Sequence, residues 1–211
     1  MSSDIDGAEF GASDVEVLAR EPLYRGFFRM ELLRYKHRKY ASGWSSVVTR
    51  ELLYRGQAVG ALLYDPVTDR VGLVEQIRPG TLEAESGPWC LEVVAGIMES
   101  GETAEAVAWR EIQEEAGLVP VSLEYICEYY PSPGGCDEHM HLYCGLASLA
   151  GVDGELHGLD SEEEDIRLLT FPVEEVFGAL YSGRFNNAAT LIALQWLQLN
   201  IQRLRAQGLP E

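Results

Sequence analysis

Residues 96–118, GIMESGETAEAVAWREIQEEAGL, are the stretch of this sequence that decides its fold. Apolar residues recur in it at helical spacing, and the pattern predicts a helix over residues 103–116. On a helical wheel with about 100° per residue, Glu111 and Glu115 fall within about 40° of each other and on the apolar side. A solvated acidic helix would carry them on the opposite side, so the sequence predicts two buried carboxylates.

Two like charges in this position need a chemical reason. Residues four apart on a helix hold their Cβ atoms roughly 5–6 Å apart, so Glu111 and Glu115 repel each other strongly when buried. A cation or a shared proton would relieve the repulsion, and a metal ion is the simplest solution. Carboxylate oxygens on one helix face suit Mg²⁺ or Mn²⁺ rather than zinc. The alternative is an exposed acidic helix with ordinary ion pairs between residues four apart.

The composition is that of an ordinary globular protein, and its charge excludes some partners. The chain has 211 residues, of which 46% are hydrophobic and 24% charged, enough for one sizeable core. No apolar run approaches the ~18 residues that a membrane span needs, and the acidic amino terminus lacks the pattern of a secretory signal, so we expect a cytoplasmic protein. The net charge of −18 argues against nucleic acid or an anionic membrane surface as a partner.

The basic residues are unevenly distributed along the chain. Residues 1–55 hold nine of the sixteen Lys and Arg residues against eight acidic ones, whereas residues 56–211 carry nearly all of the net negative charge. We expect a β-rich segment over residues 1–55 that contributes contacts to an anionic ligand, and a larger domain over residues 56–211. The first dozen residues should be loose, and two strands, LYRGFFRMELLRYKHR and SSVVTRELLYRG, should join near residues 41–43. A sheet this small should pack on the larger domain or on another subunit.

The cysteines and two histidines offer a further, separate possibility. Four cysteines form no CxxC pair and match no zinc-ligand spacing: Cys90, Cys127, Cys136 and Cys144. Free thiols are therefore expected. His139 and His141 lie close in sequence to Cys136 and Cys144, so a soft-metal site is an alternative. In an alternating strand, the two histidines would instead be neighbours on one side of the surface.

Residues 56–211 mix short strands and helices without a regular βαβ repeat. Strands are predicted at AVGALLYD, VGLVEQIRP, WCLEVVAG, LEYICEYYP, HMHLYCGLA and RLLTFP. Helices are predicted at residues 103–116, at VEEVFGALYSG and at about residues 187–205. This mixture predicts an α+β protein, or a three-layer α/β/α sandwich around a mixed sheet.

The opening stretch also carries a known motif. Gly96, Glu102 and the run REIQEEAGL at residues 110–118 have the spacing of the Nudix box, the strand-loop-helix signature of the Nudix hydrolases. The chain therefore resembles that family. The resemblance implies an α/β/α sandwich that hydrolyses a nucleoside diphosphate linked to another moiety, with Mg²⁺ or a similar ion such as Mn²⁺.

The resemblance also implies roles for the residues of the motif. It makes Glu111, Glu115 and the backbone carbonyl of Ala95 the metal ligands. Glu114, at the edge of the same helix sector, is either a further ligand or a group that supports the ligands. Arg110 stands four residues before Glu114, and we expect it to orient the glutamates through ion pairs.

Further stretches resemble the bacterial ADP-ribose pyrophosphatases within the family: LYRGFF, VEQIRPG, LEVVAG, SPGG, HGLDSEEEDIR and NNAATLIALQWLQL. This likeness implies hydrolysis of ADP-ribose to AMP and ribose 5-phosphate by a water molecule that the metal and a loop glutamate activate. It also implies a homodimer in which the subunits exchange the amino-terminal segment. Pro133 lies sixteen residues beyond Gly117, where that subfamily carries a proline.

Substrate contacts are expected mainly from basic and aromatic residues. Arg78, at the end of a predicted strand, is a candidate phosphate ligand through its planar guanidinium, and Arg50 is another. The resemblance implies that Phe27 or Phe28 stacks on adenine. Adjacent residues of a strand face opposite ways, so only one of the two should do so. Glu138, beyond the SPGG loop, completes the expected set together with the proline of that loop.

The acidic run SEEED at residues 161–165 is either a solvated loop or the source of the catalytic base. In the resembling enzymes a mobile loop at this place brings one glutamate to the water and another to the metal, and these match Glu162 and Glu164. Glu163 lies between them and could take either role. A loop position suits a lid that closes on substrate.

Two other functions are compatible with the motif. The Nudix box positions metals but does not read the sugar, so a pyrophosphatase acting on GDP-mannose or an ADP-sugar is one alternative. A non-catalytic Nudix domain that senses a nucleotide is the other. The intact Glu111, Glu115 and Arg110 argue against the second alternative.

Overall fold

The structure is a computed structural model that describes residues 9–209, with the exception of the side chain of Glu162. The described chain divides into two compact units. The amino-terminal unit consists of the residues up to Arg55 together with the loop Ser132–Glu138, and the main unit consists of the rest. The loop therefore belongs to a different unit from the residues on either side of it in sequence.

The amino-terminal unit is built on a three-stranded antiparallel sheet. Its strands are β1 (Val15–Arg25), β2 (Arg29–His37) and β3 (Val48–Tyr54). They lie in the order β1-β2-β3. The prediction of one strand through LYRGFFRMELLRYKHR is wrong, because the chain turns at residues 26–28, where Gly26 N donates to the Phe28 carbonyl at 2.9 Å. Of the dozen residues expected to be loose, residues 1–8 lie outside the described part.

The loop Ser132–Glu138 pairs with the end of β3. Leu53 N donates to the Gly135 carbonyl at 2.9 Å, and Asp137 N donates to the Leu53 carbonyl at 3.1 Å. Arg55 N donates to the Asp137 carboxylate at 2.7 Å. Backbone groups at the edge of the small sheet are thereby satisfied by a segment distant in sequence.

The main unit is organised around a mixed sheet of eight strands. The strands are β4 (Gln57–Asp65), β5 (Arg70–Ile77), β6 (Trp89–Glu92), β7 (Val94–Ile97), β8 (Ser122–Tyr129), β9 (His139–Leu146), β10 (Leu156–His157) and β11 (Ile166–Pro172). The path runs β10-β11-β5-β4-β9-β8, with β6 paired to β5 and β7 paired to β4. β4 and β9 run parallel, and the other pairs are antiparallel.

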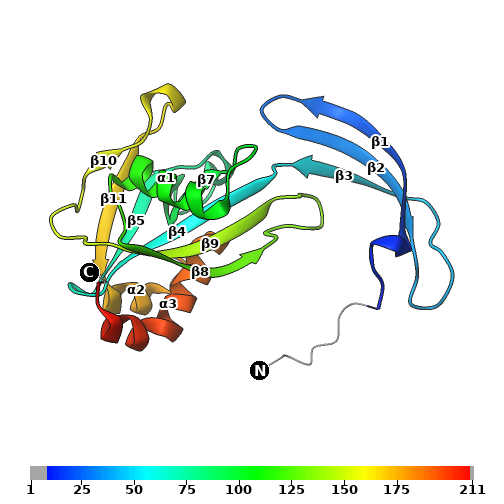
Figure 1. Cartoon of the computed structure of the whole chain (residues 1–211). Helices are drawn as coiled ribbons and strands as arrows, with labels where there is room; N and C mark the ends of the chain where they lie inside the picture. The colour runs from blue at the N-terminus through cyan, green and yellow to red at the C-terminus, as the bar shows by residue number, and fades with distance from the viewer. Residues whose placement is uncertain (1–8, 210–211) are drawn as a thin grey trace. The chain divides into compact units, whose positions relative to one another are not determined.

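Helices cover both faces of this sheet. They are α1 (Ala104–Ala116), α2 (Val173–Ala179) and α3 (Ala188–Gln207). α1 lies on one face, and α2 and α3 lie on the other (Figure 1). Alternate residues of β4 serve the two cores, since Leu62 and Tyr64 pack in the cluster that includes α2 and α3, while Ala61 and Leu63 pack with residues of α1. The arrangement confirms the predicted α/β/α sandwich around a mixed sheet.

The segment WCLEVVAG is two strands rather than the one predicted. β6 pairs with β5, whereas β7 pairs with β4, so the two halves join different neighbours. Val93, between them, donates its N–H to the hydroxyl of Thr190 at 3.0 Å. The prediction of a continuous strand is wrong because this side-chain acceptor replaces a strand partner at the break.

The remaining helices agree with their predicted positions. α3 begins after Asn187, whose side-chain oxygen accepts from Thr190 N at 3.0 Å, and continues to Gln207. Among the described residues, no helix has both the length and the apolar composition that crossing a membrane requires.

Candidate active site

The two carboxylates that the sequence singled out are buried on α1. This helix begins after Thr103, whose hydroxyl accepts from Ala106 N at 3.2 Å, and it ends at Gly117, which has a left-handed φ of 63°. Glu111 and Glu115 are only 8% and 3% exposed. The same helix also buries the apolar residues Val107, Ala108, Ile112 and Ala116. The prediction that both glutamates lie on the buried side is confirmed.

β7 holds the carboxylates from the side of the sheet. Ala95 N donates to Glu115 Oε2 at 2.9 Å. Gly96 faces Glu111, and a Cβ atom at this position would overlap the Glu111 carboxylate. The close approach of strand and carboxylate therefore requires a glycine here.

Arg110 forms ion pairs with three acidic residues of the site. Its Nη1 donates to Glu111 Oε1 at 2.6 Å and to Glu114 Oε2 at 3.0 Å. Its Nε and Nη2 donate to the two carboxylate oxygens of Glu102, each at 3.3 Å. The planar guanidinium thus holds three carboxylates in fixed positions.

Burial raises the pKa of both glutamates well above the usual range. Desolvation raises the pKa of Glu111 to about 7, with the charge of Glu114 adding to the effect and that of Arg110 opposing it. Desolvation also raises the pKa of Glu115 to about 8, although the hydrogen bond from Ala95 N acts in the opposite direction. Without a cation, the pair therefore keeps a proton near neutral pH.

The donors in this place fit a divalent cation. The carboxylates of Glu111 and Glu115 and the backbone carbonyl of Ala95 are hard oxygen donors, which Mg²⁺ and Mn²⁺ prefer. The raised pKa values indicate that the protein alone does not compensate the two charges, and a cation would do so. Three of the four predicted metal ligands are therefore brought together by α1 and β7.

The fourth predicted ligand, Glu164, comes from the chain between β10 and β11. Glu164 Oε2 accepts from Leu159 N at 3.1 Å. The negative charge of Glu164 contributes to the raised pKa of both Glu111 and Glu115, so its carboxylate lies near theirs. Its position agrees with a place among the ligands.

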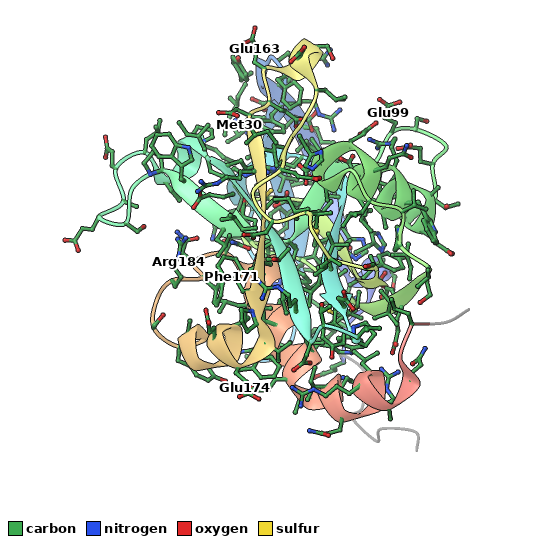
Figure 2. The ribbon with its side chains drawn as sticks, turned by 90° about the vertical axis from the view of Figure 1, so that its left-hand side faces the viewer. Met30, Glu99, Glu163, Phe171, Glu174 and Arg184 are labelled. Atoms are coloured by element: carbon green, nitrogen blue, oxygen red, sulfur yellow. The ribbon has the colours of Figure 1, made fainter. Side chains whose placement is uncertain are left out.

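The rest of the acidic loop is only partly described. Gly158 N donates to the Glu114 carbonyl at 3.3 Å, which ties the start of the loop to α1. Glu163 is exposed, has a left-handed φ of 56°, and lies at the tip of the loop with its side chain directed away from the ribbon (Figure 2). The side chain of Glu162, the predicted base, lies outside the described part, and its backbone ends the single 3₁₀ turn Asp160–Glu162.

Two further polar residues of the sheet belong to the site, and the sequence analysis missed them. Gln76 is buried, and its Nε2 donates to Glu115 Oε1 at 3.5 Å. Glu92 Oε2 accepts from Arg78 Nε at 2.6 Å, and the charge of Arg78 lowers the pKa of Glu115. The predicted phosphate ligand Arg78 is thus near the carboxylates and oriented by Glu92. Polar residues interrupting the apolar strands VGLVEQI and WCLE were the signal that could have revealed both partners.

Predicted substrate contacts also occur in the amino-terminal unit. Phe27 and Phe28 occupy the turn between β1 and β2, with ring centroids 4.8 Å apart in an edge-to-face arrangement. They do not lie in a strand, so the expectation that they face opposite ways is wrong. The guanidinium of Arg55, which the sequence analysis missed, lies 4.8 Å from the Phe28 ring centroid, and Arg55 Nε lies 2.9 Å from Glu138 Oε1.

The two remaining predicted contacts are exposed. Arg50 lies on β3, and its Nη1 donates to the Thr49 carbonyl at 2.8 Å. Pro133 lies in the loop Ser132–Glu138. The predicted adenine and loop residues thus belong to the amino-terminal unit, whereas the predicted metal ligands belong to the main unit.

Comparison with known proteins places these features in a family. The model of the NUDIX domain family matches residues 54–194. An ADP-ribose pyrophosphatase of Escherichia coli (strain K12) is 44% identical over 196 residues, which cover 93% of this chain and 93% of the relative. A GDP-mannose pyrophosphatase of Cronobacter sakazakii is 32% identical over 151 residues, which cover 71% of this chain and 78% of the relative.

A solved structure supports the same fold. The crystal structure of an ADP compounds hydrolase superposes with a TM-score of 0.66 at 19% identity and covers 91% of this chain and 97% of that chain. The family match spans more than half of the chain and includes β7, α1 and the buried carboxylates between them. On this evidence the chain belongs to the NUDIX domain family.

Proposed function

We propose that this protein is an ADP-ribose pyrophosphatase that depends on Mg²⁺, with Mn²⁺ as a substitute. It would hydrolyse the diphosphate of ADP-ribose to AMP and ribose 5-phosphate. The observation that carries the proposal is the buried pair Glu111 and Glu115, whose raised pKa values call for a divalent cation. The name of the 44% identical relative supports ADP-ribose as the substrate.

The ion would be held by the carbonyl of Ala95 and the carboxylates of Glu111, Glu115 and Glu164. When bound, it would neutralise charge on the phosphoryl oxygens and lower the pKa of a water molecule. Arg110 would keep Glu111 in place through their 2.6 Å ion pair. The site would therefore owe its geometry to residues that are already positioned without substrate.

The acidic loop would supply the general base. We assign that role to Glu162, which would accept the proton of the attacking water, and we keep Glu163 as the alternative. Glu114 would either bind a further ion or hold Arg110, with which it forms a 3.0 Å ion pair. Comparison of kcat for Glu162→Gln and Glu163→Gln tests the assignment, because only loss of the base should reduce kcat by about 10²–10⁴-fold. Equal, small effects of both changes would refute it.

Basic and aromatic residues would contact the substrate. We assign a phosphate contact to Arg78, whose guanidinium Glu92 orients. For adenine we favour Phe27, because its side chain is 86% exposed while Arg55 already covers the Phe28 ring.

Three further residues complete the proposed substrate contacts. Arg50 would contact a phosphate, and Pro133 and Glu138 would contact the substrate from the loop Ser132–Glu138. Alanine at each position should raise KM with little change in kcat if the contact is made equally in ground and transition states. An unchanged KM would remove that residue from the set.

We propose a homodimer formed through the amino-terminal segment. β1 exposes apolar side chains that a monomer would leave in water: Val15, Val17, Leu18, Leu23 and Tyr24. A three-stranded sheet with such a surface gains stability from a partner, and a second copy of the chain is the partner we propose. Light scattering after gel filtration tests this, and a fully active monomer would refute it. The four free cysteines support a cytoplasmic location, where thiols stay reduced.

The substrate assignment is tested by comparing kcat/KM for ADP-ribose, GDP-mannose and NADH, with AMP and ribose 5-phosphate identified as products. A preference for GDP-mannose would favour the alternative that the Cronobacter relative suggests. Absence of turnover with every diphosphate tested, in protein that still binds nucleotide, would favour a sensing domain. The ion pairs of Arg110 and the buried carboxylates argue for catalysis.

A further inference from the structure

A second group of metal-ligating side chains lies on β8 and β9 and shares no residue with the carboxylate site of α1. Glu128 on β8 and His139 and His141 on β9 each bring one ligand atom within 4.8 Å of the others. The histidines are two apart in a strand and so point to the same face, and Glu128 is paired with His141 in the antiparallel register. We propose that these three side chains bind Zn²⁺ or a chemically similar ion such as Co²⁺.

The distances within the group are close to those of a zinc site. Glu128 Oε2 lies 3.4 Å from His141 Nδ1 and 3.9 Å from His139 Nε2. Ligand atoms about 2.0–2.2 Å from a tetrahedral Zn²⁺ lie roughly 3.3–3.6 Å from one another. The first pair already has this separation, and a rotation of the exposed Glu128 carboxylate would supply the second. Three protein ligands leave a fourth position for water.

The two imidazoles are oriented by neighbours before any ion binds. His141 Nε2 lies 3.1 Å from Gln57 Oε1, which can only accept a hydrogen bond. Nε2 therefore carries the proton, and Nδ1 presents its lone pair toward Glu128. The ring of His139 stacks on Tyr130, with 4.5 Å between ring centroids and 12° between planes. His141 thus has the hydrogen-bonded partner that is typical of metal-ligating histidines, and the ring of His139 packs against Tyr130.

The same geometry excludes the cysteine ligands considered from the sequence. Cys144 is buried in the cluster that packs against α2 and α3. It lies three positions after His141 in the same strand, and an odd number of positions places it on the other face of β9. Cys136 is not among the side chains whose ligand atoms lie within 4.8 Å of one another in this group. Glu128 therefore takes the place of a thiolate, and mixed imidazole and carboxylate ligands favour a borderline ion over Mg²⁺.

An ion at this site would link the end of β8 to the beginning of β9, close to the segment that connects the two strands. β8 ends at Tyr129 and β9 begins at His139, so the ligands flank the residues that include the loop Ser132–Glu138. Binding should raise the melting temperature of the protein, because it adds a cross-link that the unfolded chain lacks.

The test measures Zn²⁺ binding by calorimetry to chelator-treated protein in excess Mg²⁺. In the variant Glu111→Gln/Glu115→Gln, which lacks the carboxylates of α1, we expect one Zn²⁺ per chain to remain. Adding His139→Gln/His141→Gln should abolish that binding, whereas the matched change His37→Gln should leave it intact. Gln57→Leu should weaken it by about 10–100-fold through loss of the orienting hydrogen bond.

Several outcomes would overturn the proposal, and none depends on the enzymatic assignment. Loss of all Zn²⁺ binding in Glu111→Gln/Glu115→Gln, or full affinity in the double histidine variant, would each do so. With Co²⁺ as the probe, a thiolate charge-transfer band would show a cysteine ligand and also contradict the site. If the α1 variant fails to fold by circular dichroism, the same histidine changes are compared in the otherwise unchanged protein with Mg²⁺ saturating.

Discussion

Metal-free protein should lose stability as the pH rises, because Glu115 must then ionise inside the core. Its pKa is raised from the ordinary 4.5 to about 8 in the folded state, mainly by burial. The folded state therefore binds this proton more tightly than the unfolded chain does. The stability that the proton contributes is fully present below the unfolded pKa and is lost as the pH rises through the folded one. Between about pH 5 and pH 8 the loss is on the order of 3 kcal/mol, or roughly 6–12 °C in Tm for a chain of this size.

Other groups modify this slope without reversing it. Burial also raises the pKa of Glu111, to about 7, which adds a loss of the same sign. Burial lowers the pKa of His141, so the protein regains stability through this group as the pH rises from the lowered folded pKa to the unfolded value of 6.5, and above that pH the group has no further effect. Hydrogen bonds from Arg205 lower the pKa of Asp69. The contribution of Asp69 to stability therefore changes with pH only below this pH range. Glu111 and Glu115 therefore determine most of the change in folding stability between about pH 5 and pH 8.

The assay is scanning calorimetry with a chelator across this pH range, for the unchanged protein, Glu115→Gln and the control Glu105→Gln, which alters an exposed residue of the same helix. We expect Tm to fall with pH in the unchanged protein and the control, and to vary much less in Glu115→Gln. Mg²⁺ should restore the lost Tm at high pH only where Glu115 is present. A Tm of the unchanged protein that is flat across the range, or an identical slope in Glu115→Gln, would refute the reasoning.

Three further changes test particular contacts. Gly96→Ala should displace the Glu111 carboxylate that its methyl would overlap, lowering activity and Mg²⁺ affinity by about 10–100-fold; unchanged Mg²⁺ dependence of kcat would contradict this. Arg110→Lys should reduce kcat nearly as much as Arg110→Gln does, because an ammonium cannot replace the guanidinium fork that pairs with three carboxylates. Steady-state kinetics of the two variants test this, and a near-normal kcat in Arg110→Lys would contradict it. Arg205→Met should leave kcat unchanged but lower Tm by roughly 2–4 °C through the lost pair with Asp69, a cost of about 1 kcal/mol; an unaltered Tm would mean that the pair contributes nothing.

The centre of the site was predictable because the signals for it are local. Helical period, the cap at Thr103 and the stop at Gly117 all lie within one stretch, and they determine that Glu111 and Glu115 face the core. The layer arrangement was predictable for a similar reason, since short strands and amphipathic helices limit the possible architectures.

Other features depend on contacts between distant residues, and local patterns did not reveal them. The break at Val93 exists because Thr190, from α3, accepts its N–H. The hydrogen bond from Gln76 to Glu115 joins a strand and a helix 39 positions apart, and no spacing in the sequence encodes it. The turn at residues 26–28 was missed because the run of aromatic and basic residues continues through Gly26 without the usual polar turn residues.

The pairing between Leu53 and the loop Ser132–Glu138 has a consequence for dissecting the protein. The polypeptide leaves the amino-terminal unit after Arg55, returns to it for seven residues, and leaves again, so the two units are joined by three peptide crossings. A deletion of residues 1–55 would strip Gly135 and Asp137 of their backbone partners in the middle of what remains. The amino-terminal unit is therefore built from two separate segments of the chain. A transplant of this unit into another protein would have to include both the residues up to Arg55 and the loop Ser132–Glu138.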